Sequence, residues 1–351
     1  MALNYSGFSL KVMAGAKPAI SQFACKKAMR FRLIDLIDYG LEPALHAHGV
    51  KVIHKQISVR LAHQFELLSS FPGSRPVDNL LALQINSFEE LQSMTKVVNM
   101  IQPSKDGNRK CVHKAAITKT LSNIGDRVAS SLETVVEAIP HFHQYLLSKE
   151  GHEMASQGVT ASAVVDEYIQ RMIGITTLTE HVRTLHKWQK RGREGSDQRR
   201  VGVVAVNFPI RQVVEESIEH ALHLTERALL HSCEVHILGD ASIKGTFIYS
   251  HLSHILLEML KNSVKASCEV AGTQDCMPLP VTVLVSEGAD DICIRISDQG
   301  GGMSRANLKS CKEYIPAAQK QGWHPLLVDQ QSYQPTSCPL AGMGVGIPVS
   351  A

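Results

Sequence analysis

The sequence predicts an α+β protein of two domains, in which an N-terminal four-helix bundle is followed by an α/β sandwich. Long segments with apolar residues at helical spacing dominate the first half of the chain, and short β-branched runs alternate with helical segments from residue 201 onward. Long helices joined by short loops favour an antiparallel bundle, whereas alternating helices and strands favour a sandwich. A chain of 351 residues is long enough to form both cores.

Composition narrows the class of protein. The formal net charge of +3 is too small to predict nucleic-acid binding. The chain has no run of 18 apolar residues, so we predict no transmembrane helix. Its eight cysteines include no Cys-x-x-Cys pair, and we therefore expect reduced thiols, with neither a zinc site nor a disulfide framework.

The first 30 residues are basic and contain no acidic residue before Asp35. The basic side chains before Asp35 are Lys11, Lys17, Lys26, Lys27, Arg30 and Arg32. Such a segment is typical of an organellar import sequence, and we assign residues 1–30 as a presequence outside the fold. A disordered basic tail is the alternative interpretation.

The bundle is predicted over residues 31–190. A short helix covers residues 31–40 and ends at Gly40, and a core helix contains Gln56 to His63, with Arg60 and His63 on its surface. Residues 71–76 form a turn, and further helical segments cover residues 88–101, 111–148 and 161–189. A charged, glycine-containing linker at 191–200 leads into the second domain, which spans residues 201–351.

The second domain reads as alternating strands and helices. Strands are expected at 201–206, 233–238, 245–249, 281–286 and 292–297, and helices at 209–231 and 250–268. Residues 288–291 join the last two strands as a turn.

The helix at 250–268 carries a row of polar residues next to an apolar stripe. His254, Glu258 and Asn262 are spaced by four residues, so they lie about one turn apart along the helix. A histidine, a carboxylate and an amide beside a core face are costly unless something binds them. Asn262 offers a hard oxygen ligand to magnesium, and Glu258 can accept a proton.

Two glycine-rich stretches complete this constellation. Asp298 ends a strand and is followed by Gln299 and three glycines to Gly302, and a second stretch carries Gly342, Gly344 and Gly346. Glycines allow close approach of the backbone to a ligand, and their N–H groups can bind phosphate oxygens. The irregular segment 303–339 between the two stretches has the length and composition of a functional loop over a ligand.

The order of these pieces resembles the ATP-binding fold of the GHKL superfamily, which includes histidine kinases and gyrase. The mitochondrial pyruvate and branched-chain 2-oxo acid dehydrogenase kinases are the most similar family. Their His-x-x-x-Glu-x-x-Lys-Asn-x-x-Arg-Ala motif is matched by His254, Glu258, Lys261, Asn262, Lys265 and Ala266. Their Asp-x-Gly-Gly-Gly motif is matched at 298–302, and their last glycine motif at 342–348. The stretch 56–63 also resembles a motif of this family.

The resemblance implies a protein-serine/threonine kinase that uses ATP and magnesium, with potassium as a further ion. It implies that Asn262 holds magnesium, that Glu258 is the catalytic base and that His254 tunes it. Lys261, Lys265, Asp298, Gly300, Gly302, Gly342, Gly344, Gly346 and Ile347 are the implied nucleotide-binding residues. Lys265 stands where the family has arginine, which keeps the charge and loses bidentate geometry.

The same resemblance implies the mitochondrial matrix, inhibition of the complex by phosphorylation of its decarboxylase component, docking of the bundle on the lipoyl domain of an acyltransferase, and a homodimer. Whether the complex is the pyruvate or the branched-chain one is left open. Relative to the family pattern, the chain ends at Ala351, before the last strands of the ATP-binding domain.

Two alternatives remain at this stage. A catalytically impaired protein would bind nucleotide and the complex without transferring phosphate. A histidine kinase would use His181, because residues 180–185 faintly resemble the phosphoacceptor motif of two-component sensor kinases.

Overall fold

The computed structural model describes residues 10–101, 112–191, 199–229, 233–274, 276–305 and 308. The chain divides into two compact units, Met1–Val204 and Ala205–Ala351. Most of the expected loop at 303–339, the glycine motif at 342–346 and Ile347 lie outside the described residues.

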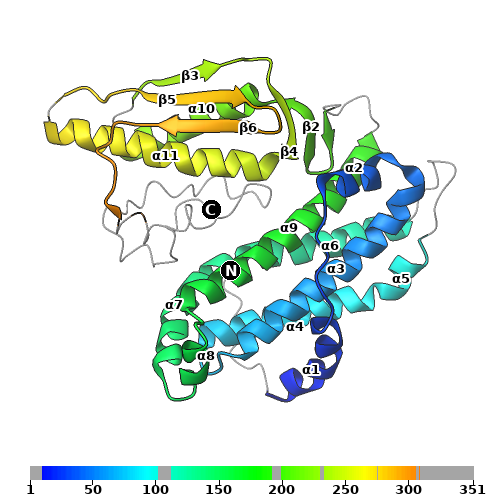
Figure 1. Cartoon of the computed structure of the whole chain (residues 1–351). Coiled ribbons are helices and arrows are strands. Elements are labelled where there is room, and N and C mark those ends of the chain that lie inside the picture. Colours follow the sequence, from blue (N-terminus) through cyan, green and yellow to red (C-terminus); the bar gives the residue numbers. More distant parts are fainter. Residues whose placement is uncertain are drawn as a thin grey trace. The chain divides into compact units, whose positions relative to one another are not determined.

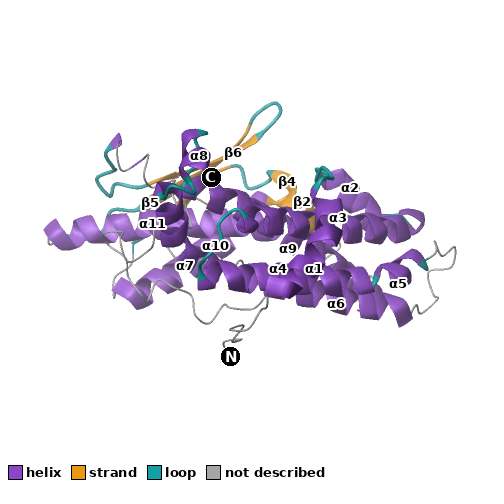
Figure 2. Cartoon of the chain, turned by 90° about the horizontal axis from the view of Figure 1, so that it is seen from below, coloured by secondary structure: helices purple, strands orange, loops and turns teal. Residues whose placement is uncertain are grey.

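The first unit is helical (Figure 2). Its described helices are α1 (Leu10–Ala24), α2 (Leu33–Leu41), α3 (Pro43–Ser69), α4 (Arg75–Ser93), α5 (Thr95–Asn99), α6 (Val112–Ser130), α7 (Leu132–Leu147), α8 (His152–Ser156) and α9 (Ala161–Arg191). Helix α3 packs on α4 and α9, α6 packs on α9, and α4 packs on α7 (Figure 1). The unit is thus a helix-rich body with a continuous core, and the four-helix topology remains a prediction.

The helix expected over 111–148 is two helices, with the break at Ser131. The Ser131 hydroxyl donates to the carbonyl of Val128 at 2.6 Å and lies 3.1 Å from the hydroxyl of Tyr168. A serine that bonds its own backbone competes with the helical ladder, which is the physical reason for the break. Helix α4 likewise starts earlier than expected, because Ser74 caps it by accepting a hydrogen bond from the Val77 N–H.

Residues 10–30 are part of the packed body. Ile20 on α1 is 0% exposed, and the Phe23 ring lies edge-on to Phe88 of α4 with centroids 5.3 Å apart. The Ser21 hydroxyl donates to Glu66 Oε1 on α3 at 2.8 Å. Helix α1 thus packs on the helical unit, whereas residues 1–30 were expected to lie outside the fold; their assignment as a presequence stays a prediction.

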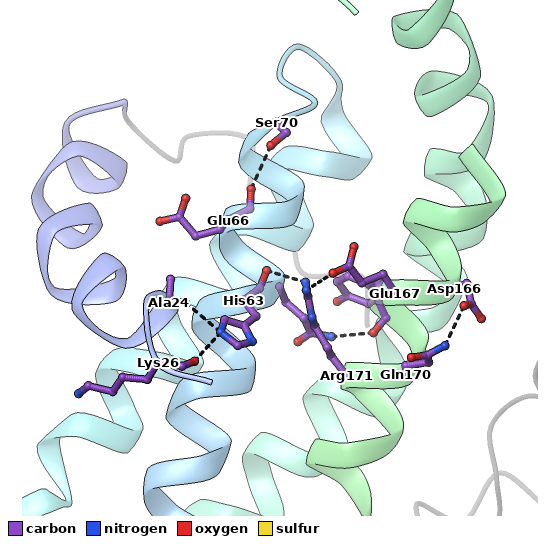
Figure 3. A network of polar contacts seen from close by, with 11 residues as sticks. Ala24, Lys26, His63, Glu66, Ser70, Asp166, Glu167, Gln170 and Arg171 are labelled. Carbon is purple, nitrogen blue, oxygen red and sulfur yellow. Dashed lines mark hydrogen bonds and ion pairs between the residues drawn. The ribbon is translucent and has the colours of Figure 1, made fainter. Parts of the chain in front are cut away.

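The segment between α1 and α2 is held by polar side chains of α3. His63 Nε2 lies 3.0 Å from the Ala24 carbonyl and 2.9 Å from the Lys26 carbonyl, as Figure 3 shows. Gln56 Oε1 accepts from the Met29 N–H at 2.7 Å, and Arg60 donates to the Met29 carbonyl at 2.7 Å. Arg60 and His63 are therefore not ordinary surface residues, since they fix the backbone of residues 24–29 on α3.

The second unit contains most of the strands. Its helices are α10 (Ile210–Leu229) and α11 (Tyr249–Gln274), and its strands are β2 (Val204–Pro209), β3 (Val235–Gly239), β4 (Lys244–Ile248), β5 (Val281–Glu287) and β6 (Ile292–Ser297). The short strand β1 (Arg200–Val201) precedes them, and the two sheets have the orders β1-β2-β4 and β3-β5-β6. Strand β5 runs parallel to β3 and antiparallel to β6, with Val283 opposite Ile237 and Ile296.

Buried and less buried side chains alternate along β5, and the buried ones belong to the core of the second unit. Val281, Val283 and Val285 of β5 point inward and are buried, while the residues between them are half-buried or exposed. The inward residues meet the apolar faces of α10 and α11, which lie against each other and cover the sheet (Figure 1). This packing places one side of α11 in the core of the second unit.

Candidate active site

Helix α11 carries three ionisable side chains that are almost fully buried. His254 is 7% exposed, Glu258 5% and Lys261 6%. The helix rotates by about 100° per residue, so positions 254, 258 and 261 fall on one face. Leu257 lies next to this face, and Leu256 and Leu260, further around the helix, belong to the apolar core of the unit.

Glu258 and Lys261 form a buried ion pair, with Lys261 Nζ 2.5 Å from Glu258 Oε1. Burial raises the pKa of the Glu258 carboxyl, and the neighbouring Lys261 ammonium opposes that rise. A carboxylate with a raised pKa is a stronger base, which suits a group that must take up a proton. The family resemblance implies that Lys261 binds nucleotide, whereas in this structure its ammonium contacts Glu258.

His254 is held in its neutral form. Its pKa is lowered to about 4, first by burial and then by the charges of Lys261 and His251. Its Nε2 atom has no hydrogen-bond partner among the described residues. A buried ring nitrogen without a partner is costly, so this atom is a candidate contact for a bound group.

Asn262 lies at the boundary between this buried face and solvent, and its side chain is exposed. Lys265, one turn further, lies 3.6 Å from Glu269 Oε1 through its Nζ atom. The expected row of three residues is therefore split, because each step of four residues advances the position by about 40° around the helix. His254 and Glu258 are buried, whereas Asn262 is exposed, so a soluble ligand can reach its amide.

The loop after β6 packs directly on α11. A Cβ added to Gly300 would lie 2.3 Å from the Cβ of Ala266, so only glycine fits this contact. Asp298 is exposed, and its Oδ1 accepts a hydrogen bond from the Gly300 N–H at 3.0 Å. Gly301 and Gly302 have φ of 79° and 69°, the left-handed region that favours glycine.

This contact brings together two motifs that are separated by more than thirty residues in the sequence. Ala266 is one helical turn beyond Asn262, and the next glycine of the loop, Gly301, faces Val270 further along α11. The role of Ala266 was missed by the site assignment, although it stands at the last position of the helix motif. The third motif, with Gly342, Gly344, Gly346 and Ile347, lies outside the described residues, and so does any contact that it makes.

His181 occupies a different place. It lies on α9 in the first unit and is 0% exposed, and burial lowers its pKa to about 4. Gly202 packs on its ring, since an added Cβ would lie 2.3 Å from Nδ1. This burial argues against a phosphoacceptor role, because the ring nitrogens cannot meet a nucleotide in solution.

The second unit also has a cavity away from the predicted site residues. A cavity of about 450 Å³ lies between β4, the start of α11 and the β5–β6 turn, and none of the predicted site residues lines it. Within the described ranges there is no group of three or more His, Cys, Asp or Glu side chains arranged to hold a metal ion. Among the described helices, none has the length and apolarity needed to cross a membrane.

Residues 30–205 match the family model described as mitochondrial branched-chain alpha-ketoacid dehydrogenase kinase. The chain is also similar to curated proteins. It is 34% identical to a mitochondrial pyruvate dehydrogenase (acetyl-transferring) kinase of Schizosaccharomyces pombe over 155 residues, which cover 43% of this chain and 36% of the yeast protein.

Two other similarities extend over more of the chain. The Drosophila melanogaster pyruvate dehydrogenase kinase is 26% identical over 334 residues, covering 90% of this chain and 73% of the fly protein. The human isozyme 1 is 23% identical over 323 residues, covering 90% of this chain and 69% of its own length. All three relatives are named as mitochondrial kinases.

Proposed function

The chain belongs to the family of mitochondrial branched-chain alpha-ketoacid dehydrogenase kinases, and we propose that it phosphorylates the decarboxylase component of a 2-oxo acid dehydrogenase complex at a serine or threonine, using ATP. In this proposal phosphorylation inhibits the complex, and the chain works in the mitochondrial matrix. The family model names the branched-chain complex and the relatives name the pyruvate complex, so the substrate class includes both.

The observation that carries the proposal is the contact of Gly300 with Ala266. It holds a glycine loop with two left-handed residues beside the helix that bears Glu258 and Asn262. Phosphoryl transfer requires positioning and neutralisation of charge more than covalent chemistry. A backbone loop next to a hard oxygen ligand and a proton acceptor meets those requirements.

Each side chain then has a role toward the nucleotide. Asn262, whose amide is exposed, would hold magnesium, and the ion would supply positive charge to offset that of the phosphates. Asp298 would read the adenine amino group. Gly300 and Gly302, with Gly342, Gly344, Gly346 and Ile347, would give backbone room or N–H groups to the nucleotide, and Lys265 would supply positive charge near the phosphates. Potassium is proposed as a further ion of the site.

Glu258 is the proposed base toward the substrate hydroxyl. Its buried position raises its pKa, which brings the carboxyl closer to the pH at which it works. Lys261 holds the carboxylate in place through the buried ion pair. His254 stays neutral and offers its free Nε2 to a bound group near Glu258.

Partners follow from the family as further proposals. The helical unit would dock on the lipoyl domain of the acyltransferase, and the chain would form a homodimer. Exposed Lys26, Lys27 and Arg30 on the segment fixed by α3 give the helical unit a basic surface that suits an acidic partner.

The test is incubation with γ-labelled ATP and magnesium, with pyruvate or branched-chain decarboxylase subunits added in parallel. We expect acid-stable label on one of these subunits. Glu258→Gln should keep nucleotide affinity and lower the transfer rate by about 10²–10⁴, because glutamine keeps the shape and cannot take the proton. Transfer at the parent rate in this variant would show that Glu258 is not the base.

A second candidate is a protein that binds nucleotide and the complex without catalysis. Lys261 pairs with Glu258, and Lys265 pairs with Glu269. Both lysines of α11 thus already contact carboxylates of the protein, which favours this candidate. Nucleotide binding with no label on either subunit would support this candidate, and acid-labile label on the chain itself would support a histidine kinase.

A further inference from the structure

The cavity of about 450 Å³ in the second unit lies near the start of α11. It is lined by residues of β4, of the starts of α10 and α11, of the β5–β6 turn and of β6, and Figure 1 shows β4, the start of α11 and this turn together. Its volume falls in the range of about 300–1,000 Å³ that is usual for small-molecule sites. Leu252 on its wall stands 14 positions before Ala266, about 21 Å along the helix, so the cavity lies away from the glycine loop.

Apolar side chains form the wall of this cavity. They are Ile210, Phe247, Leu252, Ile292 and Ile294. All but Ile210 are only partly buried, although each of them packs against the core of the unit. A ligand with an apolar body would cover this wall and remove it from water, which is a favourable change.

Gly245 of β4 keeps the cavity open. A Cβ added at this position would lie 3.0 Å from Ile210 Cδ1 and 3.3 Å from Ile292 Cδ1, so a larger side chain would take up space in the cavity. Gly245 is not among the glycines in the left-handed region, so its backbone conformation does not require glycine. Glycine inside a strand weakens the strand and often marks a place where a ligand approaches the backbone closely.

The β5–β6 turn gives the cavity an acidic rim. Glu287, Asp290 and Asp291 line it and are exposed, and among the described residues that line it none is basic. In the part of the chain that the structure describes, none of these three carboxylates has an ion-pair partner. The turn is held by its own backbone, because the Gly288 N–H donates to the Asp291 carbonyl at 2.8 Å.

We propose that this cavity binds an organic cation, an amine whose apolar body lies on the wall and whose ammonium group meets the acidic rim. The Phe247 ring on the wall adds a second attraction, since aromatic faces attract cations. A neutral molecule would gain the contact with the wall alone, and an anion would be repelled by the carboxylates. This inference does not depend on the proposed kinase activity.

Isothermal calorimetry of the full chain with 2-(1-naphthyl)ethylamine tests the proposal, with 2-(1-naphthyl)ethanol as the uncharged analogue. We expect the amine to bind at one site and about fivefold or more tightly than the alcohol, because the exposed carboxylates each add a modest attraction. Added salt should weaken binding of the amine and leave that of the alcohol unchanged. Equal affinities for the two compounds, or no binding of the amine, would overturn the proposal.

A variant of the rim tests the charge. Replacing Asp290→Asn and Asp291→Asn together should lower the affinity for the amine about fivefold and leave that for the alcohol within about twofold. Glu219→Gln, which removes an exposed carboxylate of α10 that does not line the cavity, should bind the amine as the parent does. An unchanged affinity for the amine in the double variant would contradict recognition by the rim.

A variant of the wall tests the place. Gly245→Val should abolish binding of both compounds without lowering the melting temperature, because valine favours a strand more than glycine does. Asn262→Ala, which changes the candidate nucleotide site, should bind the amine as the parent does, so this result is independent of the proposed function. Binding of the amine by Gly245→Val at the parent affinity would put the site elsewhere and overturn the proposal.

Discussion

Single residues of α11 differ in what they offer a ligand. Glu258 and His254 are buried, whereas Asn262 is exposed, one helical turn before the Ala266 on which Gly300 packs. The accessible hard ligand is therefore Asn262, and its removal should affect metal–nucleotide binding before it affects folding.

We expect Asn262→Ala to weaken binding of magnesium–ATP by more than tenfold, about 1.4 kcal/mol, because one hard ligand next to the triphosphate is lost. Isothermal calorimetry with and without magnesium measures this change. Glu226→Ala, a change of an exposed residue on α10, should leave the affinity as it is. An unchanged affinity in Asn262→Ala would show that this residue is not a magnesium ligand.

His181 gives the first unit a dependence on pH. Its pKa is lowered from 6.5 to about 4 by burial, so the unfolded chain takes up this proton at a higher pH than the folded one. The free energy of unfolding should keep its full value above about pH 6.5 and fall as pH drops toward 4. The slope for one such group is at most about 1.4 kcal/mol per pH unit.

Chemical denaturation of the chain at several pH values measures that slope. His181→Gln should flatten it, since glutamine does not titrate, while the exposed His143→Gln should not. His254 behaves in the same way in the second unit, so a residual slope there is expected. An identical slope in the parent and His181→Gln would show that His181 is not neutral and buried in the folded chain.

At the scale of elements, the N-terminal helix belongs to the core of the first unit. Burial of Ile20, the ring contact of Phe23 and the hold of α3 on residues 24–29 all connect α1 to the rest of the unit. Removal of this segment exposes apolar surface on α3 and α4, so it should cost stability.

We expect Ile20→Ala to lower the free energy of unfolding by about 2–5 kcal/mol, the usual cost of emptying a fully buried aliphatic site. Denaturant titration followed by circular dichroism measures this loss. Gln22→Ala, which changes an exposed residue of the same helix, should be nearly neutral. If Ile20→Ala is as stable as the parent, the core does not depend on α1, and residues 10–24 fit a detachable presequence.

At the scale of the whole molecule, the two units have separate cores. The candidate site lies entirely within the second unit, so its ligand should stabilise that unit directly. Proteins with two such bodies often unfold in more than one step.

We therefore expect two calorimetric transitions. Magnesium–ATP at about one hundred times its Kd adds about 2.7 kcal/mol to the folded second unit and should raise its transition by about 5–10 °C. The transition of the first unit should stay in place. A nucleotide-induced shift of the first transition alone would contradict the assignment of the site.

The sequence by itself determined most of the local structure and the family. Periodicity and turn residues predicted α9, β5 and β6 to within a few positions, because these patterns depend on neighbours along the chain. The order of His254, Glu258, Asn262 and the Asp298–Gly302 loop predicted the kinase family, which the family model confirms for residues 30–205. The residue roles within that site stay predictions.

The tertiary structure decided which of those residues meet. Only packing shows that Gly300 rests on Ala266, that Lys261 contacts Glu258, and that α1 is buried on α3. The basic composition of residues 1–30 did not predict the packing of α1, because charge along a segment does not show which apolar side chains it places against another helix. Contacts between positions far apart depend on the shape of the folded core, and a single sequence does not record that shape locally.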